Sequence, residues 1–193
     1  FAYGAGPISP VEKIAGPGNR WVVEAKRQVF GTVGIDSLAG PSEVVVVAGA
    51  GTNPEVLAFD LLDKAEHDAD ARAILLTPSL ATAEAVCKAL AMALASLPRK
   101  ATARASLARR GALVVTRTIS EALDLADRIA PEHLILHLRR PPRSLPRAGA
   151  IFLNGTPEIL GDYLAGPNHI LPTAGSARFS SALSPLDFLR WPT

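Results

Sequence analysis

The sequence contains one cysteine, few aromatic residues and no long apolar run. Cys87 is the only cysteine among 193 residues, which excludes an internal disulfide and predicts a reducing, cytoplasmic location. No apolar segment approaches the roughly 20 residues that a membrane-spanning helix needs. No basic segment followed by an apolar one indicates secretion. We therefore expect a cytoplasmic chain with no membrane partner.

The chain also has little excess of one charge, since its net charge is only +2. Basic residues cluster at 99–110 and 139–147, but almost no aromatic side chains lie between them. Proteins that bind single-stranded nucleic acid usually stack bases on aromatic rings. We therefore interpret the clusters as a solvated helix face and a solvated loop, and we expect no nucleic-acid partner.

Hydrophobic residues make up 48% of the chain, enough to build a packed core. Between residues 43 and 153, segments typical of strands alternate with segments typical of helices, an order that predicts a parallel sheet with helices on both faces. The first strand is the β-branched run EVVVVA (43–48), which suits the buried centre of such a sheet. The expected strands are 43–48, 73–77, 112–116, 133–138 and 150–153. The expected helices are 55–67, 80–97, 103–109 and 119–129, and the second of these is expected to bury Cys87.

Residues 1–41 precede this alternation. A short strand at 12–15 leads into the turn Gly16-Pro17-Gly18-Asn19 and then into a helix at 20–30. Free N–H groups at the start of such a helix can bind a nucleotide phosphate, although a simple tight turn explains the same residues. We expect an incomplete Rossmann-like α/β lobe over 42–193 and the remnant of a second, nucleotide-binding α/β lobe over 1–41, as the family resemblance given below implies.

The segment 154–181, NGTPEILGDYLAGPNHILPTAGSARFSS, is too rich in Gly, Pro, Asn, Thr and Ser to fill a core. Ordered loops of this length usually carry function. Asp162 and His169 are the side chains in it that can do chemistry. Because ligands of open parallel sheets bind at the carboxyl ends of the strands, we expect this loop to lie there. The polar stretches 60–67 and 132–133 are expected at the same edge.

Two short stretches contain groups suited to a site. In DKAEH (63–67), residues three and four apart share a helix face, so Asp63 and Lys64 are expected beside His67. This spacing suits either a metal half-site or ordinary surface ion pairs. Glu132 and His133 follow a helix and can divide acid–base work, or they form a charged turn at the helix end. His137 lies within a strand pattern and is interpreted as structural.

Taken in order, these segments resemble histidinol dehydrogenase. The matching segments are GPGNRWVVEAKRQVFGTVGID (16–36), AGPSEVVVVA (39–48), DLLDKAEHD (60–68), APEHL (130–134) and GAIFLNGTPEILGDYLAGPNHILPTAGSARFSS (149–181). The resemblance implies an NAD-dependent four-electron oxidation of L-histidinol through histidinal to L-histidine, in a zinc-containing homodimer. It implies that Asn19 contacts NAD. It also implies that His133 removes the hydroxyl proton and that Glu132 activates the water that attacks the aldehyde.

The resemblance further implies a zinc ion held by His67 and Asp162. The implied substrate contacts are Ser42, His67, His133, Asp162 and His169. The family has glutamine as a zinc ligand where this chain has Lys64, and a protonated lysine donates hydrogen bonds but accepts none. The family's C-terminal segment, which carries another zinc-ligating histidine and a substrate-binding glutamate, has no match in this chain.

These departures leave three hypotheses open. The first is a fragment or a shortened member of the histidinol dehydrogenase family, with the geometry of its site inherited and its activity impaired or dependent on missing segments. The second is a zinc-free, inactive homologue that serves as a binding or assembly partner, with Lys64 replacing the charge of the metal. The third is a related zinc- and NAD-dependent alcohol dehydrogenase that acts on another small polar alcohol.

Overall fold

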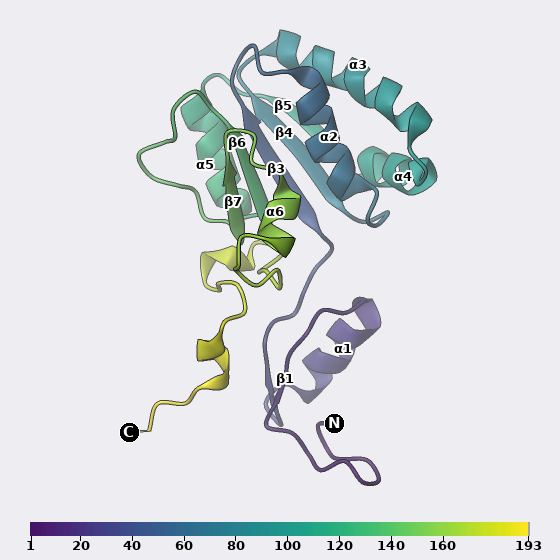
Figure 1. The fold of residues 1–193 in the computed structure, drawn as a ribbon, viewed down its shortest axis with the longest axis vertical. Coiled ribbons are helices and arrows are strands. Elements are labelled where there is room, and N and C mark those ends of the chain that lie inside the picture. Colours follow the sequence, from purple (N-terminus) through teal and green to yellow (C-terminus); the bar gives the residue numbers. More distant parts are fainter. Residues whose placement is uncertain (193) are drawn as a thin grey trace.

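The computed structural model describes residues 1–192, apart from the side chain of Asp162. Its main element is a five-stranded parallel sheet with helices on both faces (Figure 1). The strand order across the sheet is β5-β4-β3-β6-β7. The first strand of this sheet therefore lies at its centre. The next two strands extend the sheet to one edge, and the last two extend it to the other, as in a Rossmann-like fold. The strands are β3 (Glu43–Ala48), β4 (Arg72–Thr77), β5 (Ala112–Val115), β6 (His133–His137) and β7 (Ala150–Leu153).

The central strand β3 is buried along its whole length, and its alternating valines supply both sides of the core. Val44 and Val46 pack in a cluster with residues of three helices, α2 (Pro54–Ala65), α3 (Leu80–Ser96) and α4 (Lys100–Arg110). Val45 and Val47 pack on the other face against α5 (Ile119–Ile129). A run of β-branched residues without polar alternation is what a strand covered on both faces requires. The predicted α/β architecture is confirmed.

The helices begin at the polar residues that the sequence offers as caps. Asn53 Oδ1 accepts a hydrogen bond from the Glu55 N–H at 2.9 Å, and Pro54 occupies the first turn of α2. In α3, however, the expected burial of Cys87 is wrong, because this cysteine is exposed. The buried face of α3 centres on Val86, and the next residue along a helix is rotated by about 100° from it. Within the described residues, no helix is both long enough and apolar enough to cross a bilayer.

Residues 1–41 build a separate, two-stranded parallel sheet, in which β1 (Lys13–Ile14) pairs with β2 (Gly34–Ile35). The helix α1 (Arg20–Val29) lies between these strands in the sequence, and Asn19 caps it by accepting the Trp21 N–H at 3.0 Å. Gly18 precedes the cap because a Cβ there would come within 2.5 Å of the Val22 side chain.

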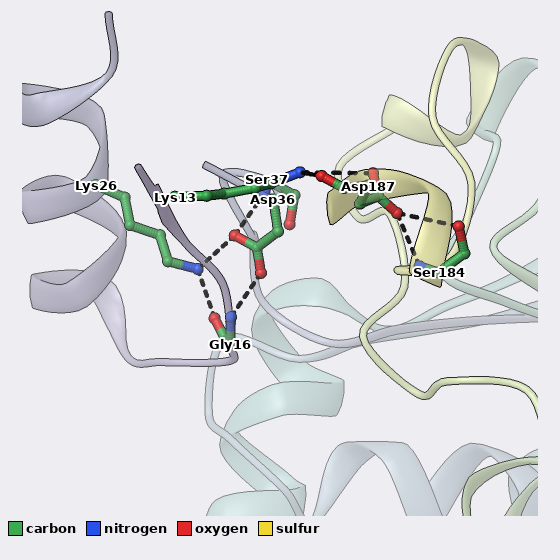
Figure 2. A network of polar contacts seen from close by, with 7 residues as sticks. All are labelled: Lys13, Gly16, Lys26, Asp36, Ser37, Ser184 and Asp187. Carbon is green, nitrogen blue, oxygen red and sulfur yellow. Dashed lines mark hydrogen bonds and ion pairs between the residues drawn. The ribbon is translucent and has the colours of Figure 1, made fainter. Parts of the chain in front are cut away.

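A buried ion pair holds α1 against β2. Lys26 Nζ lies 2.6 Å from Asp36 Oδ1, and Asp36 Oδ2 accepts the Gly16 N–H at 2.8 Å (Figure 2). The same figure shows a second link, in which Lys13 contacts Asp187 in the 3₁₀ helix η2 (Pro185–Phe188). The N-terminal sheet is thereby joined to the C-terminal part of the chain.

The segment 154–181 is not a single loop. It contains the short helix α6 (Glu158–Tyr163) and the 3₁₀ helix η1 (Ser176–Arg178). In α6, Gly161 packs against the ring of Phe152 so closely that a Cβ would lie 2.8 Å from ring atoms. A helix of six residues with a central glycine has too little periodicity to be recognised from the sequence, which explains why the expectation of a loop was wrong here.

Candidate active site

The candidate catalytic residues lie at the amino edge of the sheet, so the expectation of the carboxyl edge is wrong. His133 is the first residue of β6, and it pairs in register with Val44, the second residue of β3. The helix α2 begins after the carboxyl end of β3 and runs back across the sheet, so its last turn, with Lys64, returns to the amino edge. Chain direction therefore brings the end of α2 and the start of β6 together.

His133 is buried between two carboxylates. Its Nδ1 lies 3.5 Å from Glu132 Oε2 and its Nε2 lies 3.5 Å from Glu158 Oε1. The ring stacks on Phe152, with centroids 5.9 Å apart. Within the described part of the chain, neither ring nitrogen has a hydrogen-bond partner, so the contacts to the carboxylates are electrostatic. Neither nitrogen is therefore committed to a hydrogen bond among the described residues.

Glu132 is suited to be an ionised base. Its Oε2 accepts the Glu43 N–H at 2.9 Å. Burial raises the pKa of Glu132, but the contact with His133, the Glu43 N–H and the charge of Lys64 together hold that pKa below its ordinary value. A carboxylic acid whose pKa lies below its ordinary value is ionised at neutral pH.

Glu43 connects this site to the segment 154–181. Its carboxylate accepts a hydrogen bond from Arg72 at 2.9 Å and another from the Ala174 N–H at 3.1 Å. Burial raises the pKa of Glu43, while Arg72 and the Ala174 N–H oppose that rise and Glu132 adds to it. The polar segment that the sequence singled out is therefore fixed directly to the start of β3.

Glu158 is a site residue that sequence reasoning missed. Its Oε1 accepts a hydrogen bond from Lys64 Nζ, and both side chains are buried. Burial raises the pKa of Glu158, and the nearby charges of His133 and Lys64 partly oppose this rise. The dipeptide Pro157-Glu158 is a common helix start. It could have signalled a helix here, but not a buried partner for a residue far away in the sequence.

Two of the expected ligand contacts lie in one pocket. Asn19 and Ser42 both line a cavity of about 510 Å³ between the start of α1 and the start of β3. The same pocket includes Gly18 and Asp68. Because the side-chain oxygen of Asn19 is used as a helix cap, its amide group is the part that can donate to a ligand. The residues expected to contact NAD and substrate are thus brought together.

His169 is exposed and lines a second cavity, of about 310 Å³, together with Phe152 and Gly161. Phe152 also stacks on His133, so the same aromatic ring borders both this cavity and the imidazole of His133. His137 lies at the other end of β6, where its Nε2 is 2.7 Å from Asp60 Oδ2. That contact confirms the structural interpretation of His137.

The residues expected to hold zinc do not form a metal site in the described part of the chain. His67 follows the end of α2 and is exposed, whereas Lys64 is buried, so the expected shared face is not formed. The side chain of Asp162 lies outside the described residues. Among the residues whose side chains are described, no group of three or more His, Cys, Asp or Glu is arranged for a metal ion. Lys64 offers no lone pair when protonated, so it does not fit the position of a zinc ligand.

Comparison with known proteins identifies the family. The sequence model described as histidinol dehydrogenase matches residues 1–193. The chain belongs to the histidinol dehydrogenase family. It is 54% identical to histidinol dehydrogenase from Cereibacter sphaeroides over 194 residues, covering 98% of this chain and 45% of that protein. It is 53% identical to the enzyme from Rhizobium meliloti, with the same coverage of 98% and 45%.

The fold agrees with a solved member of the histidinol dehydrogenase family. The crystal structure of histidinol dehydrogenase from Elizabethkingia anophelis matches with a TM-score of 0.87 and 39% identity, covering 93% of this chain and 42% of that one. The chain thus spans a little under half the length of these family members.

Proposed function

We propose that this chain carries catalytic residues for the NAD-dependent oxidation of L-histidinol through histidinal to L-histidine. The observation that carries the proposal is the buried His133, which lies 3.5 Å from Glu132 and has both ring nitrogens free of hydrogen bonds among the described residues. A histidine titrates near neutrality and is therefore suited to accept and release protons. Membership of the histidinol dehydrogenase family supports the choice of substrate.

In this proposal His133 accepts the proton of the substrate hydroxyl group during the first oxidation. The ionised Glu132, whose pKa is held below its ordinary value, then accepts a proton from the water that attacks the aldehyde. NAD supplies the hydride acceptor when it is bound. Phe152 holds the ring of His133 from one side, and this packing limits the directions from which a substrate can approach the imidazole.

The pocket that contains Asn19 and Ser42 is proposed as the place where NAD and substrate approach each other. Gly18 lets the backbone of the turn lie close to α1, and N–H groups at the start of a helix favour anionic groups such as phosphates. His169 is proposed as a further substrate contact. Zinc is given no step, because Lys64 stands where a neutral ligand is expected.

The organisation into residues 1–41 and 42–193 is also proposed, and the two separate sheets support it. A homodimer is proposed because large aromatic side chains are exposed, among them Trp21, Phe179 and Trp191. Light scattering of the purified protein tests the dimer, and a single monomeric species would contradict it. The cytoplasmic location stays a prediction.

The test of the proposed function is NADH formation from L-histidinol by the purified protein. His133→Asn is expected to lower kcat at least about a hundredfold, since general acid–base groups contribute factors of roughly 10²–10⁴. Glu132→Gln is expected to act mainly on the second oxidation, so that histidinal accumulates. His137→Asn, on the same strand, is the matched control and is expected to leave kcat of the folded protein unchanged. Unchanged kcat in His133→Asn would refute the assignment.

A further inference from the structure

A buried ion pair lies beside the proposed catalytic histidine. Lys64, in the last turn of α2, donates from Nζ to Oε1 of Glu158, in the first turn of α6. The side chains are only 5% and 6% exposed. Since 94 positions of sequence separate the two residues, only the fold brings them together. The proposed reaction gives neither of them a role.

His133 is the third member of this cluster. Its Nε2 lies 3.5 Å from the same Glu158 oxygen that accepts the hydrogen bond from Lys64. The other oxygen, Glu158 Oε2, has no hydrogen-bond partner among the described residues. Through its Oε1 atom, Glu158 therefore holds the ammonium group of Lys64 beside the imidazole of His133.

An ammonium group at this position competes with a metal ion for the same carboxylate. Metal ions in proteins are bound through lone pairs of N, O and S atoms, and a protonated lysine has none to offer. A metal that displaced the ammonium group from Glu158 Oε1 would open the buried pair and leave that group buried without a partner, which is strongly unfavourable.

We infer that the Lys64–Glu158 pair excludes a divalent metal ion from this site and supplies the positive charge there in its place. The inference rests on the proposed function for the identity of the site. It departs from the zinc-containing site that the family resemblance implies.

Zinc affinity tests the inference directly. The purified protein is titrated with zinc in competition with a coloured chelator, first as wild type and then as Lys64→Gln. The wild type is expected to hold no stoichiometric zinc. Lys64→Gln is expected to bind zinc at least about a hundredfold more tightly, the ratio expected for opening a buried ion pair. Lys88→Gln removes an exposed lysine from α3 and is the matched control, expected to equal the wild type.

Two results would overturn the inference. One is a wild-type protein with one tightly bound zinc per chain. The other is a folded Lys64→Gln variant whose zinc affinity equals that of the wild type. If Lys64→Gln does not fold, Lys64→Met keeps both the apolar stem and the Glu158 carboxylate, and it is expected to show the same gain in affinity.

The readout separates this inference from the proposed function. Zinc affinity is measured without substrate or NAD, so it does not depend on activity. A zinc-free protein that forms no NADH would refute the proposed function and leave the inference intact. A zinc-loaded protein that oxidises histidinol would do the reverse.

Discussion

The ion pair between Lys26 and Asp36 is expected to control the stability of the N-terminal unit, residues 1–41, more than any contact on the surface of α1. The two charged groups lie 2.6 Å apart, and their side chains are 6% and 3% exposed. Lys26→Met keeps the length of the aliphatic stem but removes the ammonium group. The Asp36 carboxylate then stays buried, with only the N–H groups of Gly16 and Ser37 as donors.

Removing one partner of a buried ion pair typically costs about 3–5 kcal/mol. The lower end applies here, because the two backbone N–H groups continue to stabilise the charge of Asp36. We therefore expect a loss of about 3 kcal/mol. The neighbouring Arg27 pairs with Glu24, but this pair is exposed, and Arg27→Met is expected to cost less than about 1 kcal/mol.

Native-state hydrogen exchange separates a local loss from a global one. In Lys26→Met, the amides of α1, such as the Phe30 N–H bonded to the Lys26 carbonyl, are expected to exchange about a hundredfold faster. The amides of β3 are expected to change much less, since the five-stranded sheet has its own core. Equal acceleration in Lys26→Met and Arg27→Met would refute the argument. So would equal acceleration in α1 and β3.

Three further predictions follow from individual contacts. Gly161→Ala is expected to lower stability by about 1–3 kcal/mol in thermal unfolding, because its Cβ would overlap the Phe152 ring at 2.8 Å; an unchanged Tm would contradict this contact. The pKa of Asp36 lies below its ordinary value of 3.8, because hydrogen bonds from Gly16 and Lys26 outweigh the effect of burial. The contribution of Asp36 to stability is therefore present above pH 3.8 and is lost as the pH falls through the lower pKa of the folded state. When the free energy of unfolding is measured by denaturant titration at a series of pH values, Asp36→Asn is expected to reduce its decrease at acid pH. Cys87 is exposed and should react with a thiol reagent in the native protein at the rate of a free thiol, whereas a requirement for denaturant would show that it is covered.

The elements that could be predicted from the sequence are those whose signal is local. The run EVVVVA has one interpretation, a strand buried on both faces, and β3 occupies those six residues. The helix α5 likewise has its cap, Thr118, and its apolar spacing within a single segment. For α6 the only local signal is its start, Pro157-Glu158. Its six residues are held by the close approach of Gly161 to Phe152 on β7, a contact that local periodicity does not report.

The same distinction applies to the candidate site. Glu132 and His133 are adjacent, so their residue types offered acid–base chemistry as one of two interpretations. Glu158 pairs with Lys64 across 94 positions, and no local pattern predicts that contact. The metal half-site that was one of two interpretations of DKAEH is not formed among the described residues, for a related reason. α2 ends at Ala65, so Lys64 turns into the core while His67 lies beyond the helix and is exposed.

The position of the site at the amino edge has a structural cause that goes beyond chain direction. The crossing from the N-terminal unit to β3 passes this edge, where the Gly40 N–H donates to Thr173 and Glu43 accepts from the Ala174 N–H. The segment 154–181 is thereby held against the start of β3 rather than at its end. Pocket residues Asn19 and Ser42 come from the two sides of this junction. A change that separates the two units is therefore expected to disrupt the ligand pocket before it disrupts the buried contacts of His133, which lie within the larger sheet and its helices.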